Sequence, residues 1–415
     1  MKTELAPEFR DTPEGQEADA ILRSCVHCGF CTATCPTYQL LGDELDGPRG
    51  RIYLIKEVLE GAPVTQKTQL HLDRCLTCRS CETTCPSGVR YGQLLDIGRN
   101  IVEAKVGRTG VERMERVGLR KALLSRPLFG AALAMGRVAR HFLPRELAER
   151  IPAGAPAGPW PAPRHPRKMI VMEGCVQPSL KPGIDAAMAR VLDRLGISPL
   201  RVAGGGCCGA LSHHLSAEDE ARAIVRRNID AWWPHAQRGL EAIVVTASGC
   251  GVMVKDYGHF LARDPAYAAK ATKIAELARD PIEIVAEEWK AIAPMIAMDQ
   301  GPRRIAFHPP CTLQHGQRIR GQVEEILLAI GHSLMPVADT HLCCGSAGTY
   351  SVLQPQIAGQ LKANKLRALE ASRPDVIATA NIGCMTHLES GTKTPVRHWV
   401  ELLDERMFGS GPSRP

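Results

Sequence analysis

The sequence predicts a helical N-terminal domain followed by two copies of an α/β domain, each built on a parallel sheet. Three observations predict this fold class. The first part of the chain has apolar residues at helical spacing and lacks β-branched runs, as in 52–60 and 93–106. After residue 167, strand-like segments alternate with amphipathic helices, which is typical of parallel sheets. A cysteine pattern that recurs within this second part indicates a duplicated domain.

Five segments are expected along the chain. The helical domain covers 1–112 and a basic helical segment covers 113–150. Residues 151–167 are so rich in Pro, Ala and Gly that we expect an extended linker. The first α/β repeat, 168–300, is expected to contain strands at 168–172, near 198–203 and at 242–247, with helices at 184–197 and 216–233. The second repeat, 301–408, runs the same way through 303–308, 322–331, 333–338, 355–371 and 375–380.

Length and composition exclude several classes of protein. The 415 residues are too many for one domain of roughly 100 to 200 residues. A hydrophobic share of 44% and a charged share of 23% exclude a disordered or collagen-like chain. No apolar run approaches the roughly 18 residues of a membrane span, and no signal peptide is readable, so a cytoplasmic protein is expected. In that reducing compartment, 16 cysteines favour ligands or redox groups over structural disulfides.

The first eight cysteines form two copies of the pattern C-x2-C-x2-C-x3-C-P, displaced by 50 residues. In paired runs of this kind, three cysteines bind one 4Fe-4S cluster and the fourth crosses over to the other cluster. We therefore expect a ferredoxin-like pair of clusters. The first would be held by Cys25, Cys28, Cys31 and Cys85, and the second by Cys75, Cys78, Cys81 and Cys35. Zinc is the alternative, but its four-cysteine sites usually come as two separated C-x2-C pairs.

The other eight cysteines repeat with displacements of 136, 136, 136 and 134 residues: Cys175, Cys207, Cys208 and Cys250 correspond to Cys311, Cys343, Cys344 and Cys384. Each follows the carboxyl end of an expected strand, so the thiols of one repeat should converge at one sheet edge. Adjacent cysteines followed by Gly suit a further iron-sulfur centre. Zinc, empty thiols and a redox disulfide are the alternatives. Nearby histidines are candidate ligands or proton donors, namely His213, His214, His308, His315 and His387.

Positive charge is concentrated in one segment. The formal net charge is +7, and residues 113–145 hold eight basic residues against one acid. With leucines and phenylalanines interleaved, this segment could contact an anionic membrane surface or an acidic partner, the alternative being a solvated helical face. Pro127 should interrupt any single long helix. Nucleic acid is not an expected partner, because no recognisable reading motif accompanies the charge.

The two cysteine runs followed by two domains with a CCG motif resemble the family of glycolate oxidase iron-sulfur subunits. The resemblance extends over about residues 17–408, in segments such as GGGCCGALSHHL, HPPCTLQHGQ and NIGCMTHL. It implies an electron-transfer subunit of a bacterial oxidoreductase. FAD-binding subunits would oxidise glycolate to glyoxylate, and this chain, inactive alone and without catalytic residues of its own, would pass the electrons toward a quinone or other acceptor.

Related families supply the alternatives. They are the heterodisulfide reductases and the iron-sulfur subunits of lactate-utilisation systems and anaerobic glycerol-3-phosphate dehydrogenase. The fullest CCG motif ends C-x2-C, whereas Met253 and His387 stand at the last position here. This departure argues against the five-cysteine cluster of the heterodisulfide reductases in either repeat. The sequence also has no dinucleotide, phosphate-loop or hydrolase motif, so it predicts no site for an organic cofactor.

Overall fold

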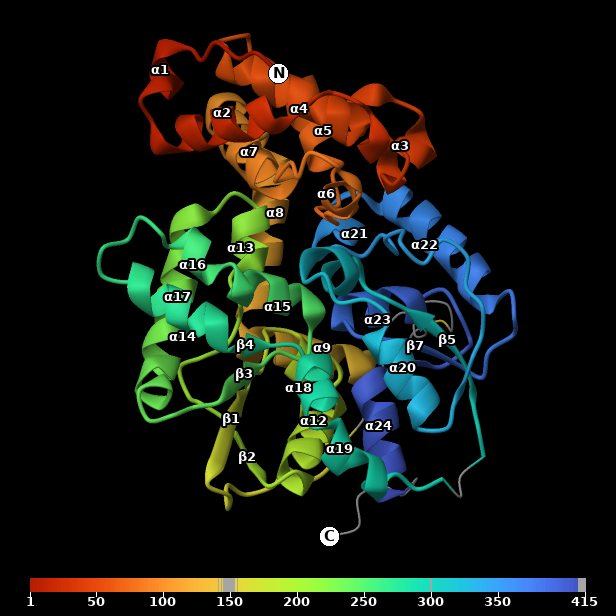
Figure 1. Ribbon diagram of the computed structural model, residues 1–415. Coiled ribbons are helices and arrows are strands. Elements are labelled where there is room, and N and C mark those ends of the chain that lie inside the picture. Colours follow the sequence, from red (N-terminus) through yellow and green to blue (C-terminus); the bar gives the residue numbers. More distant parts are fainter. Residues whose placement is uncertain (141, 143, 145–153, 155, 299–300, 410–415) are drawn as a thin grey trace.

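The structure is a computed structural model that describes residues 1–140, 142, 144, 154, 156–298 and 301–409. A helical N-terminal unit lies across one end of two α/β domains that sit side by side (Figure 1). Its helices are α1 (Pro7–Arg10), α2 (Pro13–Ser24), α3 (Pro36–Leu41), α4 (Pro48–Leu59), α5 (Gln66–Asp73), α6 (Ser80–Thr84) and α7 (Tyr91–Val106), with 3-10 turns at Phe30–Thr32 and Glu44–Asp46.

Helices α4 and α7 form the centre of the helical unit, and they correspond to the two helices expected from apolar spacing. Ile55, Leu94 and Leu95 are fully buried in its core. The two helices approach closely at Gly98, where an added Cβ would lie 2.6 Å from Cγ1 of Ile55. Apolar packing therefore builds a core that also includes Cys25, Cys75 and Cys81 of the two cysteine runs.

Each α/β domain contains a four-stranded sheet in which every strand pair is parallel. The first comprises β1 (Arg167–Val171), α11 (Gln177–Leu180), α12 (Gly183–Arg194), β2 (Ile197–Leu200), α13 (Ala210–His214), α14 (Glu218–Ala236), β3 (Ala242–Val244), α15 (Ser248–Lys255), α16 (Tyr257–Phe260), α17 (Ala268–Leu277), β4 (Ala278–Arg279), α18 (Pro281–Glu287), α19 (Trp289–Ile292) and a 3-10 turn at Ala293–Met295. The second comprises β5 (Arg304–His308), a π-helical turn (Thr312–Gly316), α20 (Gln322–Ala329), β6 (Ser333–Leu334), α21 (Tyr350–Leu353), α22 (Pro355–Glu370), β7 (Val376–Thr379), α23 (Ile382–Glu389), β8 (Val396–His398) and α24 (Trp399–Phe408).

The strand orders are β2-β1-β3-β4 and β6-β5-β7-β8, so the two sheets have the same topology. The predicted fold class, a helical domain followed by duplicated parallel α/β domains, is confirmed. Sequence patterning missed the edge strands β4 and β8, which have two and three residues. It also overestimated the strand expected at 333–338, of which only Ser333 and Leu334 pair.

The two α/β domains share one apolar core. Helices α12 and α24 pack together in a cluster of buried residues that draws on both sheets. Polar contacts cross the same boundary. Nε2 of His398 lies 3.0 Å from the carbonyl oxygen of Thr246, and the Ser248 amide donates to the carbonyl of Ala380 over 3.2 Å. The two α/β domains therefore pack against each other through an extensive apolar and hydrogen-bonded interface.

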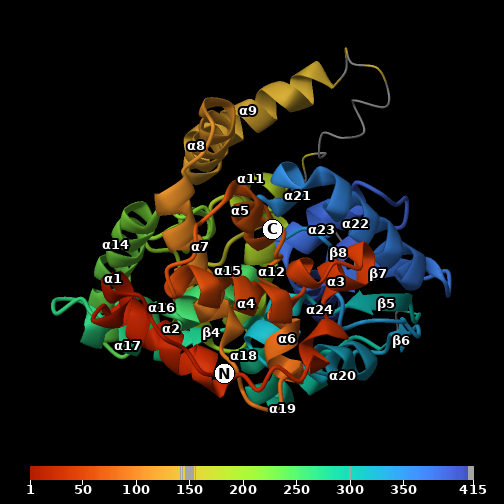
Figure 2. The same cartoon turned by 90° about the horizontal axis from the view of Figure 1, so that it is seen from above.

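The basic segment forms α8 (Gly110–Leu124) and α9 (Arg126–Ala139), with Pro127 in the first turn of α9 as expected for an interruption. Figure 2 shows both helices set off from the body along one side of the molecule, and neither contains a buried residue. Within the described ranges, no helix is long and apolar enough to cross a bilayer. Arg145 and four residues of the expected linker, 151–153 and 155, lie outside the described residues, whereas 156–166 form neither helix nor strand.

Several of the basic side chains of this segment contact the body of the protein. Arg116 pairs with Asp73 at 2.9 Å, while Arg120 and Lys121 pair with Glu220 at 2.7 and 2.6 Å. Arg126 donates to the carbonyl of Gly174 over 3.1 Å. These contacts attach the two helices to the body, and the outward surface exposes large apolar side chains beside charged ones such as Glu112, Arg113 and Glu115. Its exposed large apolar side chains are Val111, Met114, Val117, Leu128, Met135, Val138 and Phe142.

Candidate metal centres

The two N-terminal cysteine runs fold against each other so that their thiols gather in two sets. Cys25, Cys28, Cys31 and Cys85 line one small cavity, and Cys35, Cys75, Cys78 and Cys81 line a second, with Cys81 bordering both. Each set thus contains three cysteines of one run and the fourth cysteine of the other. This is the grouping that the crossover pattern predicts. That these thiols bind iron remains a prediction.

Left-handed backbone conformations shape both cysteine loops. His27 (φ 60°) and Gly29 (φ 85°) stand between the cysteines of the first run. Thr77 (φ 54°) and Arg79 (φ 57°) occupy the same places in the second. For the non-glycine residues this conformation costs about 1–2 kcal/mol each. A bound centre that fixes the loop would offset that cost.

The second set is buried, and two of its thiols resist ionisation. Burial raises the pKa of Cys78 and of Cys81 well above the usual value for a thiol, and neighbouring thiols add to the effect. In the first set, burial followed by the charge of Cys25 raises the pKa of Cys31 to about 11. Groups like these become thiolates when a cationic centre compensates their charge, which iron does and a hydrogen-bonded core does not. The donor chemistry of both sets therefore fits 4Fe-4S clusters.

A buried guanidinium supplies further positive charge beside the second set. Arg51 is 1% exposed and donates to the carbonyl of His71 over 2.7 Å and to Oγ1 of Thr37 over 3.2 Å. Asp46, fully buried, pairs with Arg51 at 3.4 Å and with Arg74 at 2.8 Å. The hydroxyl of Tyr91 donates to the sulfur of Cys75 over 3.6 Å. An anionic sulfur-rich centre would be stabilised by these donors.

The cysteines of each α/β domain also come together at the carboxyl ends of the strands. In the first domain, Cys207 contacts Cys175 and Cys208, and Cys208 contacts Cys250. In the second, the sulfurs of Cys311 and Cys343 are 3.8 Å apart, and Cys344 contacts both Cys343 and Cys384. Cys250 and Cys384 lie in the first turns of α15 and α23 rather than in loops. Four thiols therefore converge in each domain, as the strand order predicted.

The glycine of each CCG motif has a conformational role. Gly209 and Gly345 have φ values of 93° and 91°. Their amides donate to the sulfurs of Cys207 over 3.5 Å and Cys343 over 3.4 Å. A Cβ on Gly345 would lie 2.7 Å from the carbonyl oxygen of Ala358, so helix α22 leaves no room for a side chain.

The candidate histidines differ in their surroundings. His315 is satisfied by Oγ1 of Thr83 at 2.8 Å and by the carbonyl of His341 at 2.9 Å, so it links the helical unit to the second α/β domain. His387 points Nε2 to the carbonyl of Ala358 at 3.3 Å. Met253, 6% exposed, packs in the apolar core of the first domain. His308 is different, because neither of its ring nitrogens has a hydrogen-bond partner among the described residues.

The second N-terminal set lies directly against the cysteines of the second α/β domain. Leu76 and Cys78 share a buried cluster with Cys311 and Cys343. The hydroxyl of Tyr350 donates to the carbonyl of Arg74 over 3.0 Å at the same boundary. Sequence reasoning did not find this contact, because no local pattern relates residues more than 200 positions apart.

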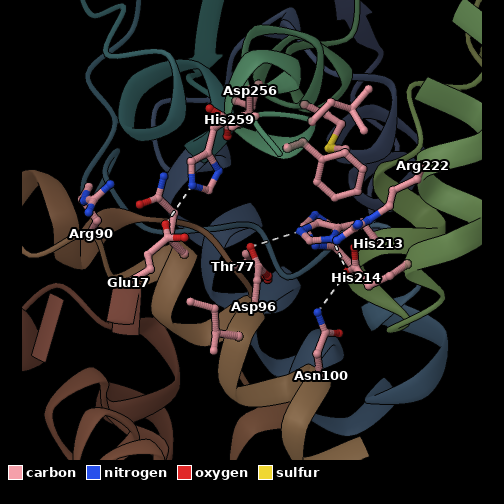
Figure 3. Close-up of a pocket in the computed structure, with 18 of the residues that line it drawn as sticks. Glu17, Thr77, Arg90, Asp96, Asn100, His213, His214, Arg222, Asp256 and His259 are labelled. Carbon is pink, nitrogen blue, oxygen red and sulfur yellow. Dashed lines mark hydrogen bonds and ion pairs between the residues drawn. The ribbon is translucent and has the colours of Figure 1, made fainter. Parts of the chain in front are cut away.

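A cavity of about 730 Å³ opens between the helical unit and the α/β domains, and Cys78 is among its lining residues (Figure 3). His213 lies in its wall, with Nε2 3.2 Å from Asp96 and Nδ1 2.7 Å from Glu218. Burial lowers the pKa of His213, but the two carboxylates outweigh it and raise the pKa to about 10. His214 is exposed to the cavity next to it. Asp96 belongs to α7 and lies far from His213 in the sequence, so no local pattern indicates this pair.

Comparison with known proteins agrees with the geometry. Residues 21–89 match the family described as a 4Fe-4S dicluster domain, and residues 169–255 and 305–389 both match the family described as a cysteine-rich domain. With the four thiol sets, these matches define an iron-sulfur protein of the two-cluster type joined to paired cysteine-rich domains.

Relatives over the whole chain make the assignment more specific. The chain is 56% identical to the glycolate oxidase iron-sulfur subunit of Escherichia coli K12, over 98% of this chain and 99% of the relative. It therefore belongs to the family of glycolate oxidase iron-sulfur subunits. A probable glycolate oxidase iron-sulfur subunit of Bacillus subtilis is 26% identical over 94% of this chain and 92% of that protein. Lactate utilization protein A of an Exiguobacterium strain is 25% identical over 56% of this chain and 94% of the relative.

The crossed thiol sets predict which cluster each variant damages. Cys35→Ser should disturb the cluster of Cys75, Cys78 and Cys81, and Cys85→Ser should disturb the cluster of Cys25, Cys28 and Cys31, because the fourth ligand comes from the opposite run. Electron paramagnetic resonance of the two reduced proteins distinguishes the clusters, and each variant serves as the control for the other. A Cys35→Ser protein whose second cluster is intact would contradict the pairing.

The ion pairs of His213 predict a pH-dependent stability. A free histidine titrates near pH 6.5, so a folded-state pKa of about 10 makes this residue stabilising below about pH 6.5. The contribution is lost as the pH rises toward 10. The thermal midpoint of the protein should therefore exceed that of His213→Gln at pH 6 by more than at pH 9.

The matched control for this comparison is His235→Gln, since His235, in the last turn of α14, forms no ion pair among the described residues. Its midpoint should differ from that of the unchanged protein by the same amount at both pH values. A constant difference for His213→Gln would show that the carboxylates do not hold its proton.

Proposed function

We propose that this chain is the electron-transfer subunit of a complex that oxidises glycolate to glyoxylate. FAD-binding subunits would perform the oxidation, and this chain would carry the electrons to a quinone or other acceptor. The observation that carries the proposal is the succession of thiol sets: the first N-terminal set adjoins the second, and the second adjoins the cysteines of the second α/β domain. Closely spaced redox centres are what a relay of single electrons requires.

Each centre would be held by residues of this chain. Cys25, Cys28, Cys31 and Cys85 would bind one 4Fe-4S cluster, and Cys75, Cys78, Cys81 and Cys35 the other. When bound, the clusters supply reversible one-electron chemistry. The protein contributes the burial of the second set, the fixed charge of Arg51 and the hydrogen bond from Tyr91, all of which act on the reduction potential.

We propose that electrons enter at the first cluster. Cys28 is exposed, whereas Cys35, Cys75, Cys78 and Cys81 are buried. Val26 and Phe30 flank Cys28 and are 67% and 61% exposed, which leaves an apolar surface beside the first set. A flavin subunit docked there would bring its cofactor near the outermost centre.

We propose that the electron acceptor binds in the cavity that Cys78 lines. Its volume of about 730 Å³ suits a small organic molecule. Ile97, Val252 and Phe260 offer apolar contacts, and His213 holds a proton between two carboxylates. A quinone takes up protons as it takes up electrons. Because His213 holds a proton in the same cavity that Cys78 lines, we favour a quinone over an electron-transfer protein as the acceptor.

Helices α8 and α9 are proposed as a contact with a partner subunit. Peripheral membrane contact through residues 113–145 is the other possibility that the sequence suggested. Because several arginines of these helices are paired with the body, few cations remain to attract anionic lipid. The exposed apolar side chains fit a groove on another protein better.

Because the FAD-binding subunits would oxidise glycolate and this chain would only transfer electrons, we predict that the isolated chain does not oxidise glycolate. Purified alone with its iron, it should not reduce an artificial dye with glycolate, because its sequence has no flavin or nicotinamide motif. Adding the FAD-binding subunits should restore glycolate-dependent dye reduction. As a control, the chain reduced by dithionite should be reoxidised by a soluble quinone. Sustained glycolate oxidation by the lone chain would rule out the proposal.

The contact through α9 predicts the effect of polar substitutions on its outer surface. Leu128→Ser combined with Met135→Ser should weaken association with the flavin subunits about tenfold or more, since losing buried apolar contacts at an interface costs at least about 1.4 kcal/mol. Quantitative pull-down measures the association, and iron content should not change.

The control for these substitutions is Leu328→Ser, because Leu328 is 53% exposed on the second α/β domain, away from α9. It should leave association unchanged. If the double variant retains its partner but no longer binds anionic vesicles, the helices contact the membrane instead. Unaltered binding in both assays would leave them as a solvated surface.

A further inference from the structure

The second α/β domain contains a buried histidine without a partner. His308 is the last residue of β5, it is 1% exposed, and neither ring nitrogen has a hydrogen-bond partner among the described residues. Leaving a buried polar group without a hydrogen-bond partner destabilises the folded protein. Because both nitrogens of the ring lack a partner, that destabilisation indicates that the imidazole binds something else.

The ring lies next to the cysteines of this domain. A ring nitrogen of His308 and the sulfurs of Cys344 and Cys384 all lie within 4.8 Å of one another. The sulfurs of Cys311 and Cys343 are 3.8 Å apart and complete the set. Five donor groups, four thiols and one imidazole, therefore converge in a buried position.

The first α/β domain has no such imidazole. The displacement of 136 residues that relates Cys175 to Cys311 places Met172 opposite His308. Met172 is 3% exposed and lines a small cavity with Cys175 and Cys250. A thioether is a weak ligand for iron in competition with thiolates. The two repeats thus offer different donor sets at the same place in the fold.

The additional donor does not come from the end of the CCG motif. His387 stands where the fullest motif has its last cysteine, but its Nε2 contacts the carbonyl of Ala358. A buried cation accompanies the donors instead. Lys365 is 4% exposed, and its ammonium donates to the carbonyl of Asp339 over 2.6 Å within the field of Cys343 and Cys344. Burying the Lys365 ammonium group costs desolvation free energy, and a negatively charged centre nearby would offset that cost.

We propose that His308 is a ligand, through one ring nitrogen, of an iron-sulfur centre held by Cys311, Cys343, Cys344 and Cys384. The corresponding centre of the first domain would have thiolate ligands only. This inference rests on the proposed function in one respect, that the cysteine-rich domains bind iron and sulfide. Neutral imidazole in place of thiolate removes negative charge from an iron and raises its reduction potential. The centre that touches the second N-terminal set is therefore the stronger electron acceptor of the two.

Isotope labelling of histidine tests the ligand directly. The whole chain is prepared anaerobically with ¹⁵N-histidine, and pulsed electron paramagnetic resonance is recorded in the oxidised and reduced states. A strong ¹⁵N coupling of directly bound imidazole is expected. It should disappear completely in His308→Cys, in which a thiolate replaces the imidazole and the iron content is retained. The midpoint potential of the same centre should fall in that variant.

A second variant covers the case in which the centre has no paramagnetic state. His308→Leu removes the donor altogether and should lower the iron content per chain. His332→Leu is the matched control, because His332 is a buried histidine of the same domain with an unpaired Nε2, yet it binds Arg303 and Arg406 rather than thiols. Its iron content should equal that of the unchanged chain.

Three results would overturn the inference. They are a histidine coupling that survives His308→Cys, an unchanged iron content and spectrum in His308→Leu, and zinc rather than iron in the second domain. Each can be told apart from failure of the proposed function. That function fails when the eight N-terminal cysteines bind no clusters or when the reduced chain passes no electrons on, and neither result depends on His308.

Discussion

The rest of the structure depends on one constraint: sets of cysteine thiols must be brought together in the interior of the protein. A buried sulfur set is stable only if the backbone turns sharply enough to collect it and if positive charge or hydrogen-bond donors compensate it. Residues close to each thiol set provide both the sharp backbone turn and the compensating charge or hydrogen-bond donor. Left-handed residues such as Thr77 and Arg79 turn the N-terminal loops, and the amides of Gly209 and Gly345 face the sulfurs of the CCG motifs. Arg51 is buried beside the second N-terminal set, and Lys365 is buried near the cysteines of the second α/β domain.

The parts of the molecule that were predictable from sequence are those governed by local spacing. The cysteine runs define their own grouping, because three ligands within seven residues have few ways to surround one centre. Strands and helices of the α/β repeats alternate visibly, and a parallel sheet brings their cysteines to one edge. Contacts between distant segments were not predictable. Asp96 and His213 belong to different units, and the ion pairs of Arg116 and Arg120 became visible only once the body was folded beside them.

Duplication gave the two α/β domains one topology but not one environment. The second domain faces the helical unit at Cys78 and Thr83, through Cys311 and His315. The first meets the helical unit around the cavity, where His213 pairs with Asp96 and Met253 is also in the wall. Two copies of one fold can therefore differ in the chemistry of their centres, since a single residue at the end of a strand, methionine or histidine, changes the donor set.

The position of Cys78 between the helical unit and the second α/β domain ties the second N-terminal set to the docking of these two units. Cys78 shares a buried cluster with Leu76, Cys311 and Cys343, and it also lines the cavity between the units. A cluster held there would therefore have packed protein on one side and the cavity on the other. Solvent would reach that centre through the cavity alone, so any change that loosens the docked units would expose it from a second side.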